Sequence, residues 1–214
     1  MISHKLVHRI SVIIIIVLYA VGLLGFLTVY RKLMIELTPI ILMISLLLLL
    51  INQHEWNRFF VLFIISIMIA GFLIEVIGVE TGLIFGHYTY GQTLGIQVFN
   101  VPLLIGVNWL LLVFSSGMIT NLVKANGFWR ALFGAFLMLA LDLSLEPVAI
   151  AFDFWSWENN TVPVQNYVFW FLFSFIFHWV FQSFEFERIN RFAIVLFIVQ
   201  WIFFMTLSFI INLI

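Results

Sequence analysis

Apolar runs of about 20 residues alternate with short polar segments along most of this chain. A bilayer core is about 30 Å thick, and a helix needs about 20 apolar residues to cross it. The pattern therefore predicts an all-α fold, a polytopic transmembrane helical bundle that forms a single integral membrane domain over residues 1–214. The seven predicted spans are 10–30, 33–51, 59–80, 101–123, 131–150, 167–184 and 192–213.

The composition supports a membrane protein and argues against several other classes. Hydrophobic residues make up 64% of the chain and charged residues only 9%, whereas soluble domains contain about 25% charged residues. The net charge of −1 argues against nucleic acid as a partner. The chain has no cysteine, which excludes disulfides, thiolate metal ligands and a cysteine nucleophile.

Basic residues in the connections predict the orientation of the bundle. Lys and Arg concentrate in cytoplasmic loops, so we predict a cytoplasmic amino terminus in a multi-pass protein of the cell inner (plasma) membrane. The two long connections, 81–100 and 151–166, then lie on the outer side. The side of the amino terminus carries Lys5, Arg9, Arg58, Lys124, Arg130, Arg188 and Arg191, and the other side only Arg31 and Lys32.

Three acidic residues, Glu75, Asp142 and Glu146, lie inside predicted spans that contain no Lys or Arg near them. Ionisable groups within a bilayer are costly and are functional candidates by default. At 1.5 Å rise per residue, these acids and Asn108 lie roughly 6–12 Å from the outer ends of their helices. Apolar surroundings and nearby like charges favour the neutral form of a carboxyl group. At least one of the three is expected to be protonated near neutral pH, as a general acid must be.

Four segments carry a resemblance to a known family. They are GFLIEVIGVETGLIFGHYTYG (71–91), VPLLIGVNW (101–109), LDLSLEPVA (141–149) and FWSW (154–157). Together they resemble the CruF-type membrane carotenoid hydratases, which include bisanhydrobacterioruberin hydratase and γ-carotene 1′-hydroxylase. Two features depart from the family pattern: Glu146 stands where Asp is common, and residues 158–161 replace a loop rich in Gly and Tyr.

The resemblance implies a hydro-lyase of carotenoid biosynthesis. It would add water to the terminal C1=C2 double bond of an acyclic ψ-end, as in lycopene or a γ-carotene-like substrate, and form a tertiary alcohol without a cofactor. Contact with other carotenoid enzymes is a further expected partner interaction. We expect Asp142 to be the acid, Glu75 or Glu146 to be the base, and Asn108 to hold the water. Expected substrate-binding residues are His87, Tyr88, Tyr90, Trp109, Trp157 and Asn166, with His87 also a candidate proton relay.

Other functions compete with this hypothesis. A membrane lycopene cyclase shares the protonation step but captures the cation with an internal double bond. A proton-coupled transporter needs a polar path through both halves of the bundle, and the inner half offers little beyond His178 and Gln200. No Lys lies within a predicted span, which excludes a retinal Schiff base. A metal hydrolase using Glu75, His87 and Asp142 has weak ligand spacing, so we predict no metal and activity that survives chelation.

Overall fold

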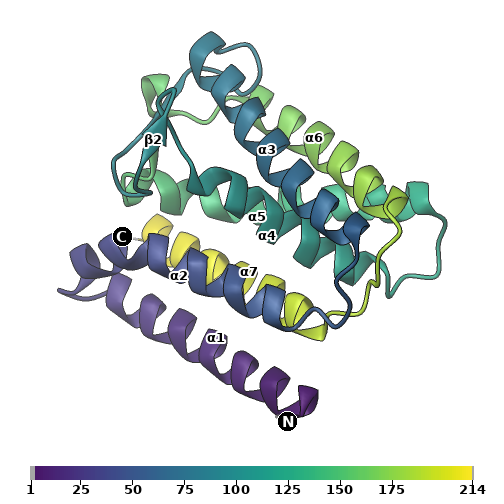
Figure 1. The fold of residues 1–214 in the computed structure, drawn as a ribbon. Coiled ribbons are helices and arrows are strands. Elements are labelled where there is room, and N and C mark those ends of the chain that lie inside the picture. Colours follow the sequence, from purple (N-terminus) through teal and green to yellow (C-terminus); the bar gives the residue numbers. More distant parts are fainter. Residues whose placement is uncertain (1–2, 214) are drawn as a thin grey trace.

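A computed structural model describes residues 3–213, and within them seven α-helices form the predicted all-α bundle. Figure 1 shows α1, α2 and α7 side by side in one layer, α3 and α6 in the opposite layer, and α4 and α5 between them. The amino and carboxyl termini lie at opposite ends of the bundle. The helices are α1 (His4–Phe26), α2 (Arg31–Ile51), α3 (Arg58–Thr81), α4 (Leu104–Thr120), α5 (Gly127–Ala151), α6 (Val164–Ser183) and α7 (Arg191–Leu213).

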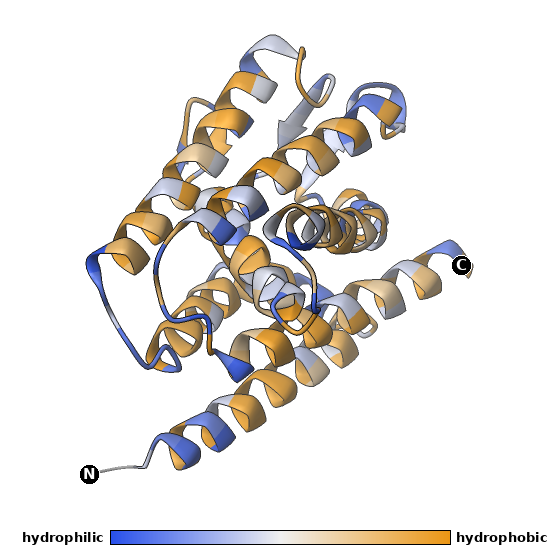
Figure 2. Cartoon of the chain, turned by 90° about the vertical axis from the view of Figure 1, so that its right-hand side faces the viewer, coloured by the Kyte–Doolittle hydropathy of each residue, from blue (hydrophilic) through white to orange (hydrophobic). Residues whose placement is uncertain are grey.

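Six of these helices are long and apolar enough to cross a bilayer, and α4 is shorter, with 17 residues. At 1.5 Å per residue, α4 spans roughly 26 Å, close to the thickness of the hydrocarbon core. Of its 17 residues, 14 are buried, because α4 lies at the centre of the bundle. Figure 2 shows the hydrophobic residues along the helices and hydrophilic ones concentrated at the turns. The seven helices correspond to the seven predicted spans.

Several of the predicted boundaries were wrong by three to six residues. Helix α1 begins at His4, six residues before the apolar run, because the side chain of Ser3 accepts a hydrogen bond from the backbone N–H of Leu6 at 3.3 Å. It ends at Phe26, where a turn begins, rather than at residue 30. Residues Val101–Pro102 belong to a short strand and not to α4. Apolar character alone does not separate a buried strand from a helix end.

Asparagine side chains begin three helices at the end of the bundle that holds the amino terminus. Asn57 accepts from the backbone N–H of Phe60 at 2.9 Å at the start of α3. Asn126 does the same for α5, and Asn190 accepts from Ala193 at the start of α7. Each cap satisfies a backbone donor that the first helical turn leaves free. At its other end α3 stops at Gly82, whose φ of 66° is a left-handed conformation that glycine adopts without steric cost.

Four short strands form two pairs, and none of these strands was predicted from the sequence. One pair joins the two long connections. Strand β1 (Tyr88–Tyr90) pairs antiparallel with β4 (Trp155–Trp157), and β2 (Gln97–Val98) pairs with β3 (Val101–Pro102). A 3-10 turn, η1 (Glu158–Asn160), follows β4. Side chains alternate between the two faces of a strand, so the middle residues of β1 and β4 are exposed while their four aromatic neighbours face the helices. The aromatic pairs are Tyr88 with Trp157 and Tyr90 with Trp155.

Candidate active site

Glu75 of α3 is buried and accepts three hydrogen bonds. The phenols of Tyr88 and Tyr90 donate to its Oε2 at 2.6 and 2.8 Å, and the indole of Trp109 donates to its Oε1 at 3.0 Å. Gly71, one turn before Glu75, allows Trp109 to approach α3, since a Cβ at residue 71 would lie 2.6 Å from the Cβ of Trp109. The close contact between α3 and α4 therefore places the indole donor against the carboxylate.

Glu146 of α5 also accepts three hydrogen bonds, from a different set of donors. The indoles of Trp155 and Trp157 donate to its Oε2 at 3.1 and 2.7 Å. The amide of Asn166, in the first turn of α6, donates to its Oε1 at 3.3 Å. Both indoles come from β4, and the two phenols that donate to Glu75 come from β1. The pairing of β4 with β1 therefore positions the donors to both carboxyl groups together.

Asp142 lies one helical turn before Glu146 and is fully buried. Its Oδ2 accepts from the same Asn166 amide at 3.2 Å. Its Oδ1 has no hydrogen-bond partner among the described residues. One amide thus bridges two carboxyl groups, and Asp142 is the less completely satisfied of the two.

All the donors to these carboxyl groups are neutral side chains. Burial raises the pKa of Tyr88 and Tyr90 well above the usual range, and the nearby charge of Glu75 raises it further. Both phenols therefore remain protonated donors across the physiological pH range. Hydrogen bonds to an ionised carboxylate stabilise the charged form, so these neutral donors are the groups that oppose the cost of burying a negative charge without a basic partner.

A small cavity of about 20 Å³ lies between these groups, and we call it the acid cavity. A space of at least about 10–15 Å³ holds one water molecule, so the acid cavity has room for about one. Asn108 lines it, and its side-chain amide makes no hydrogen bond with the described residues. The complete lining is Glu75, Phe85, Tyr88, Tyr90, Ile105, Asn108, Trp109, Glu146, Trp155, Trp157, Asn166 and Trp170.

Two residues expected at the site do not line the acid cavity. Asp142, the expected acid, lies behind it and reaches it only through the bridge of Asn166 to Glu146. His87 is exposed and lies in a separate surface hollow beside Glu158. The structure brings the other eight expected residues to the cavity: Glu75, Asn108, Glu146, Tyr88, Tyr90, Trp109, Trp157 and Asn166.

Sequence reasoning missed three aromatic residues of the lining, Phe85, Trp155 and Trp170. Trp155 shares the inward face of β4 with Trp157, and reading W-S-W as a strand would have found it. Trp170 lies four residues after Asn166 on the same face of α6. Its ring stacks on that of Trp109, with centroids 4.4 Å apart and an interplanar angle of 19°.

Within residues 3–213, no three His, Asp or Glu side chains are arranged to hold a metal ion. His87 is too far out on the surface to join Glu75 and Asp142 as the alternative metal site required. The expectation of catalysis that survives chelation stays a prediction.

Comparison with known proteins places the chain in a family. The profile of the carotenoid biosynthesis protein family matches residues 31–214 and so covers α2 to α7. The chain belongs to the carotenoid biosynthesis protein family. The resemblance drawn from the four sequence segments is thereby confirmed.

A curated relative of this family member is the bisanhydrobacterioruberin hydratase of Haloarcula japonica. The two chains are 32% identical over 117 residues, which make up 51% of this chain and 40% of the relative. The chain thus matches less than half of the length of that hydratase. No solved structure matches the chain significantly.

Proposed function

We propose that this protein is a carotenoid hydratase of the cell membrane that adds water to the terminal C1=C2 double bond of an acyclic ψ-end. The observation that carries the proposal is the acid cavity, which has room for about one water between two carboxyl groups and is surrounded by aromatic rings. Family membership and a relative named as a hydratase support the same reaction. Its product would be a tertiary alcohol.

The first step is proton transfer to C2 of the alkene. Asp142 and Glu146 share one Asn166 amide, and two adjacent carboxyl groups favour a state with a single proton because their charges repel. Only Glu146 of this pair lines the acid cavity. We therefore assign the proton donor to Glu146, with Asp142 as its partner in holding the proton. This replaces the expectation that Asp142 itself contacts the alkene.

Protonation at C2 leaves a tertiary cation at C1, which aromatic faces stabilise electrostatically. The rings of Trp109, Trp155 and Trp170 line the cavity in which this cation would form. Hydrogen bonds from the indole N–H groups or stacking contacts hold these three rings in place. Trp155, for example, donates its indole N–H to Glu146. Such fixed rings need little rearrangement as the charge develops.

Attack by water completes the reaction. The water oxygen bonds to C1, and Glu75 takes the proton that the water loses, while the free amide of Asn108 orients the water. The three donors to Glu75 stabilise the ionised form, in which it can accept that proton. In balance, Glu146 has lost a proton and Glu75 has gained one, and transfer between them restores the starting state.

A lycopene cyclase is the nearest alternative, because it begins with the same protonation. It must keep water away from the cation until the ring closes. A polar cavity with room for a water beside two carboxyl groups favours hydration over cyclisation.

The test is to express the chain in a bacterium that accumulates lycopene and to analyse the carotenoids by mass spectrometry. Hydration predicts products heavier by one or two water molecules. A product of unchanged mass and altered absorption would show a cyclase. If lycopene remains unchanged in this host, and γ-carotene remains unchanged in a host that accumulates it, while the protein is inserted in both, the proposed reaction is wrong.

A further inference from the structure

A second cavity, of about 60 Å³, lies between α1, α2 and α7, and we call it the apolar cavity. Helix α1 contributes Gly22 and Phe26, and α7 contributes Phe203 across from them. Phe203 packs edge-on against Phe26 with ring centroids 5.9 Å apart. The complete lining is Leu18, Tyr19, Gly22, Phe26, Thr38, Ile41, Leu42, Asn108, Phe154, Gln200, Phe203 and Phe204.

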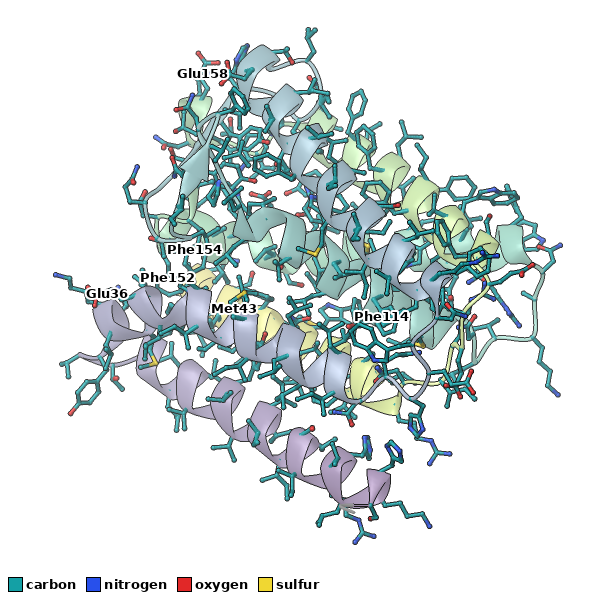
Figure 3. The ribbon with its side chains drawn as sticks, viewed as in Figure 1. Glu36, Met43, Phe114, Phe152, Phe154 and Glu158 are labelled. Carbon is teal, nitrogen blue, oxygen red and sulfur yellow. The ribbon has the colours of Figure 1, made fainter. Side chains whose placement is uncertain are left out.

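The apolar cavity adjoins the acid cavity at two points. Asn108 lines both cavities. Phe154 lines the apolar cavity while Trp155, the next residue, lines the acid cavity. Figure 3 shows Phe152 and Phe154 between the strands and the layer of α1, α2 and α7. Thin walls of single side chains therefore separate the space for the reacting group from the apolar space.

The lining identifies the chemistry of an occupant. No charged side chain lines the apolar cavity. Gln200 donates to the Tyr19 hydroxyl at 3.0 Å, and Thr38 donates to the carbonyl of Met34 at 3.0 Å. Oε1 of Gln200 has no partner among the described residues. Such a space favours an uncharged hydrocarbon over a polar ligand or an ion.

We propose that the apolar cavity holds the first part of the polyene chain of an acyclic carotenoid, directly behind the ψ-end that reacts in the acid cavity. The inference rests on the proposed function, because it places the next segment of the same substrate. A chain whose end lies beside Asn108 in the acid cavity continues past that residue into the apolar cavity, which Asn108 also lines.

The first helix then acts as a wall that selects the polyene. The family profile begins at residue 31, after α1 ends at Phe26. Helix α1 nevertheless supplies a third of the residues that line the apolar cavity: Leu18, Tyr19, Gly22 and Phe26. The part of the chain outside the family profile thus shapes the space for the substrate, and we expect it to influence which carotenoid fits.

Gly22→Leu is the variant that tests this assignment. A Cβ at residue 22 would meet the ring of Phe203 at 3.6 Å, an ordinary contact, so the rest of a leucine side chain extends into the apolar cavity. We expect lycopene affinity to fall about tenfold or more, as overfilling a packed space does. The matched control is Ala20→Leu, which adds the same side chain to the exposed face of α1 and should bind lycopene normally.

Binding is measured with lycopene itself, on the full-length protein purified in detergent, from its visible absorption and induced circular dichroism. The double variant Gly22→Leu/Phe203→Ala restores volume next to the new side chain and should regain binding, which separates a filled cavity from a misfolded protein. Normal lycopene binding by Gly22→Leu, or no binding by the unmodified protein, would overturn the assignment.

The same experiment keeps the two proposals apart. Glu36→Gln changes neither cavity, since Glu36 is exposed and pairs only with Lys32, and should bind lycopene like the unmodified protein. If the unmodified protein binds lycopene and Gly22→Leu does not, but no hydrated product ever forms, the hydratase proposal fails and the apolar cavity stands. If hydration proceeds equally in Gly22→Leu and the unmodified protein, the hydratase stands and the apolar cavity is not the polyene site.

Discussion

Two of the buried groups of polar side chains in the described residues differ in whether they border a cavity with room for a water. The first is the acid cavity with Glu75 and Glu146. The second surrounds His178 of α6, which is fully buried. Nδ1 of His178 donates to the carbonyl of Ser174 at 2.7 Å, so in the neutral ring Nε2 accepts from the hydroxyl of Ser116 at 2.8 Å.

The difference teaches how to recognise function among buried polar groups. Both ring nitrogens of His178 are occupied, and the residue lines neither the acid cavity nor the apolar cavity. Around the acids, one oxygen of Asp142 and the amide of Asn108 have no partner among the described residues, and there is space for a water. A polar group in a bilayer is costly in both cases. Open space for a water beside a polar group, rather than burial, marks the group that does chemistry.

The largest expected effect comes from removing the two carboxyl groups that line the acid cavity. Glu75→Gln and Glu146→Gln keep shape and polarity but cannot transfer the proton. Each should lower hydration by about 10²–10⁴-fold, the usual contribution of a general acid or base. The measurement is hydrated carotenoid formed per inserted protein. Glu36→Gln is the control, since Glu36 is exposed and only pairs with Lys32 at 4.0 Å.

Asp142→Asn sharpens the assignment within the pair. Because Asp142 does not line the acid cavity, its loss should lower the rate less than Glu146→Gln does. Residues that act as one unit have non-additive effects, so Asp142→Asn/Glu146→Gln should be little worse than Glu146→Gln. A larger loss in Asp142→Asn than in Glu146→Gln would make Asp142 the direct acid, as the sequence first indicated.

An intermediate effect is expected from Trp157→Phe. This change removes the shorter of the two hydrogen bonds from indoles to Glu146, at 2.7 Å, and keeps an aromatic ring. Glu146 becomes charged as it gives its proton to C2, and a hydrogen bond to a charged group contributes about 1.5–3 kcal/mol, so we expect a loss of about tenfold or more in the rate of hydration. Trp129→Phe is the matched control, because Trp129 is exposed near the start of α5. Equal rates in both variants would mean that the indole N–H does not tune Glu146.

The helices were predictable because each apolar run is long enough to mark a span by itself. The strands were not, since β1 and β4 are three residues long and lie more than 60 residues apart in the chain. Their register depends on which aromatic side chains fit under the loops, and no periodic pattern in the local sequence indicates it. The missed residue Trp155 follows from this, because its place at the site depends on that pairing.

Part of the site was also predictable from depth along the helices. Counting residues from the helix ends brought Glu75, Glu146 and Asn108 to one level, and the structure puts all three around one cavity. Which of Asp142 and Glu146 lines the acid cavity was not predictable, since residues four apart share a helix face. Asn166 of α6 decides it by bridging the two carboxyl groups, and its position depends on how α6 packs on α5.

The smallest effect on hydration is expected from Ser116→Ala, which removes the partner of Nε2 of His178. Leaving a buried polar atom unpaired destabilises a fold by about 1–3 kcal/mol, so the thermal midpoint of the detergent-solubilised protein should fall. Hydration per folded protein should stay within about twofold, since the general acid and base of the reaction are untouched. Ser183→Ala is the control, because its exposed hydroxyl bonds only to the carbonyl of Trp179 in its own helix. If Ser116→Ala instead lowers hydration as strongly as Glu75→Gln with an unchanged midpoint, His178 belongs to the proton path, and the contrast between the two buried groups is wrong.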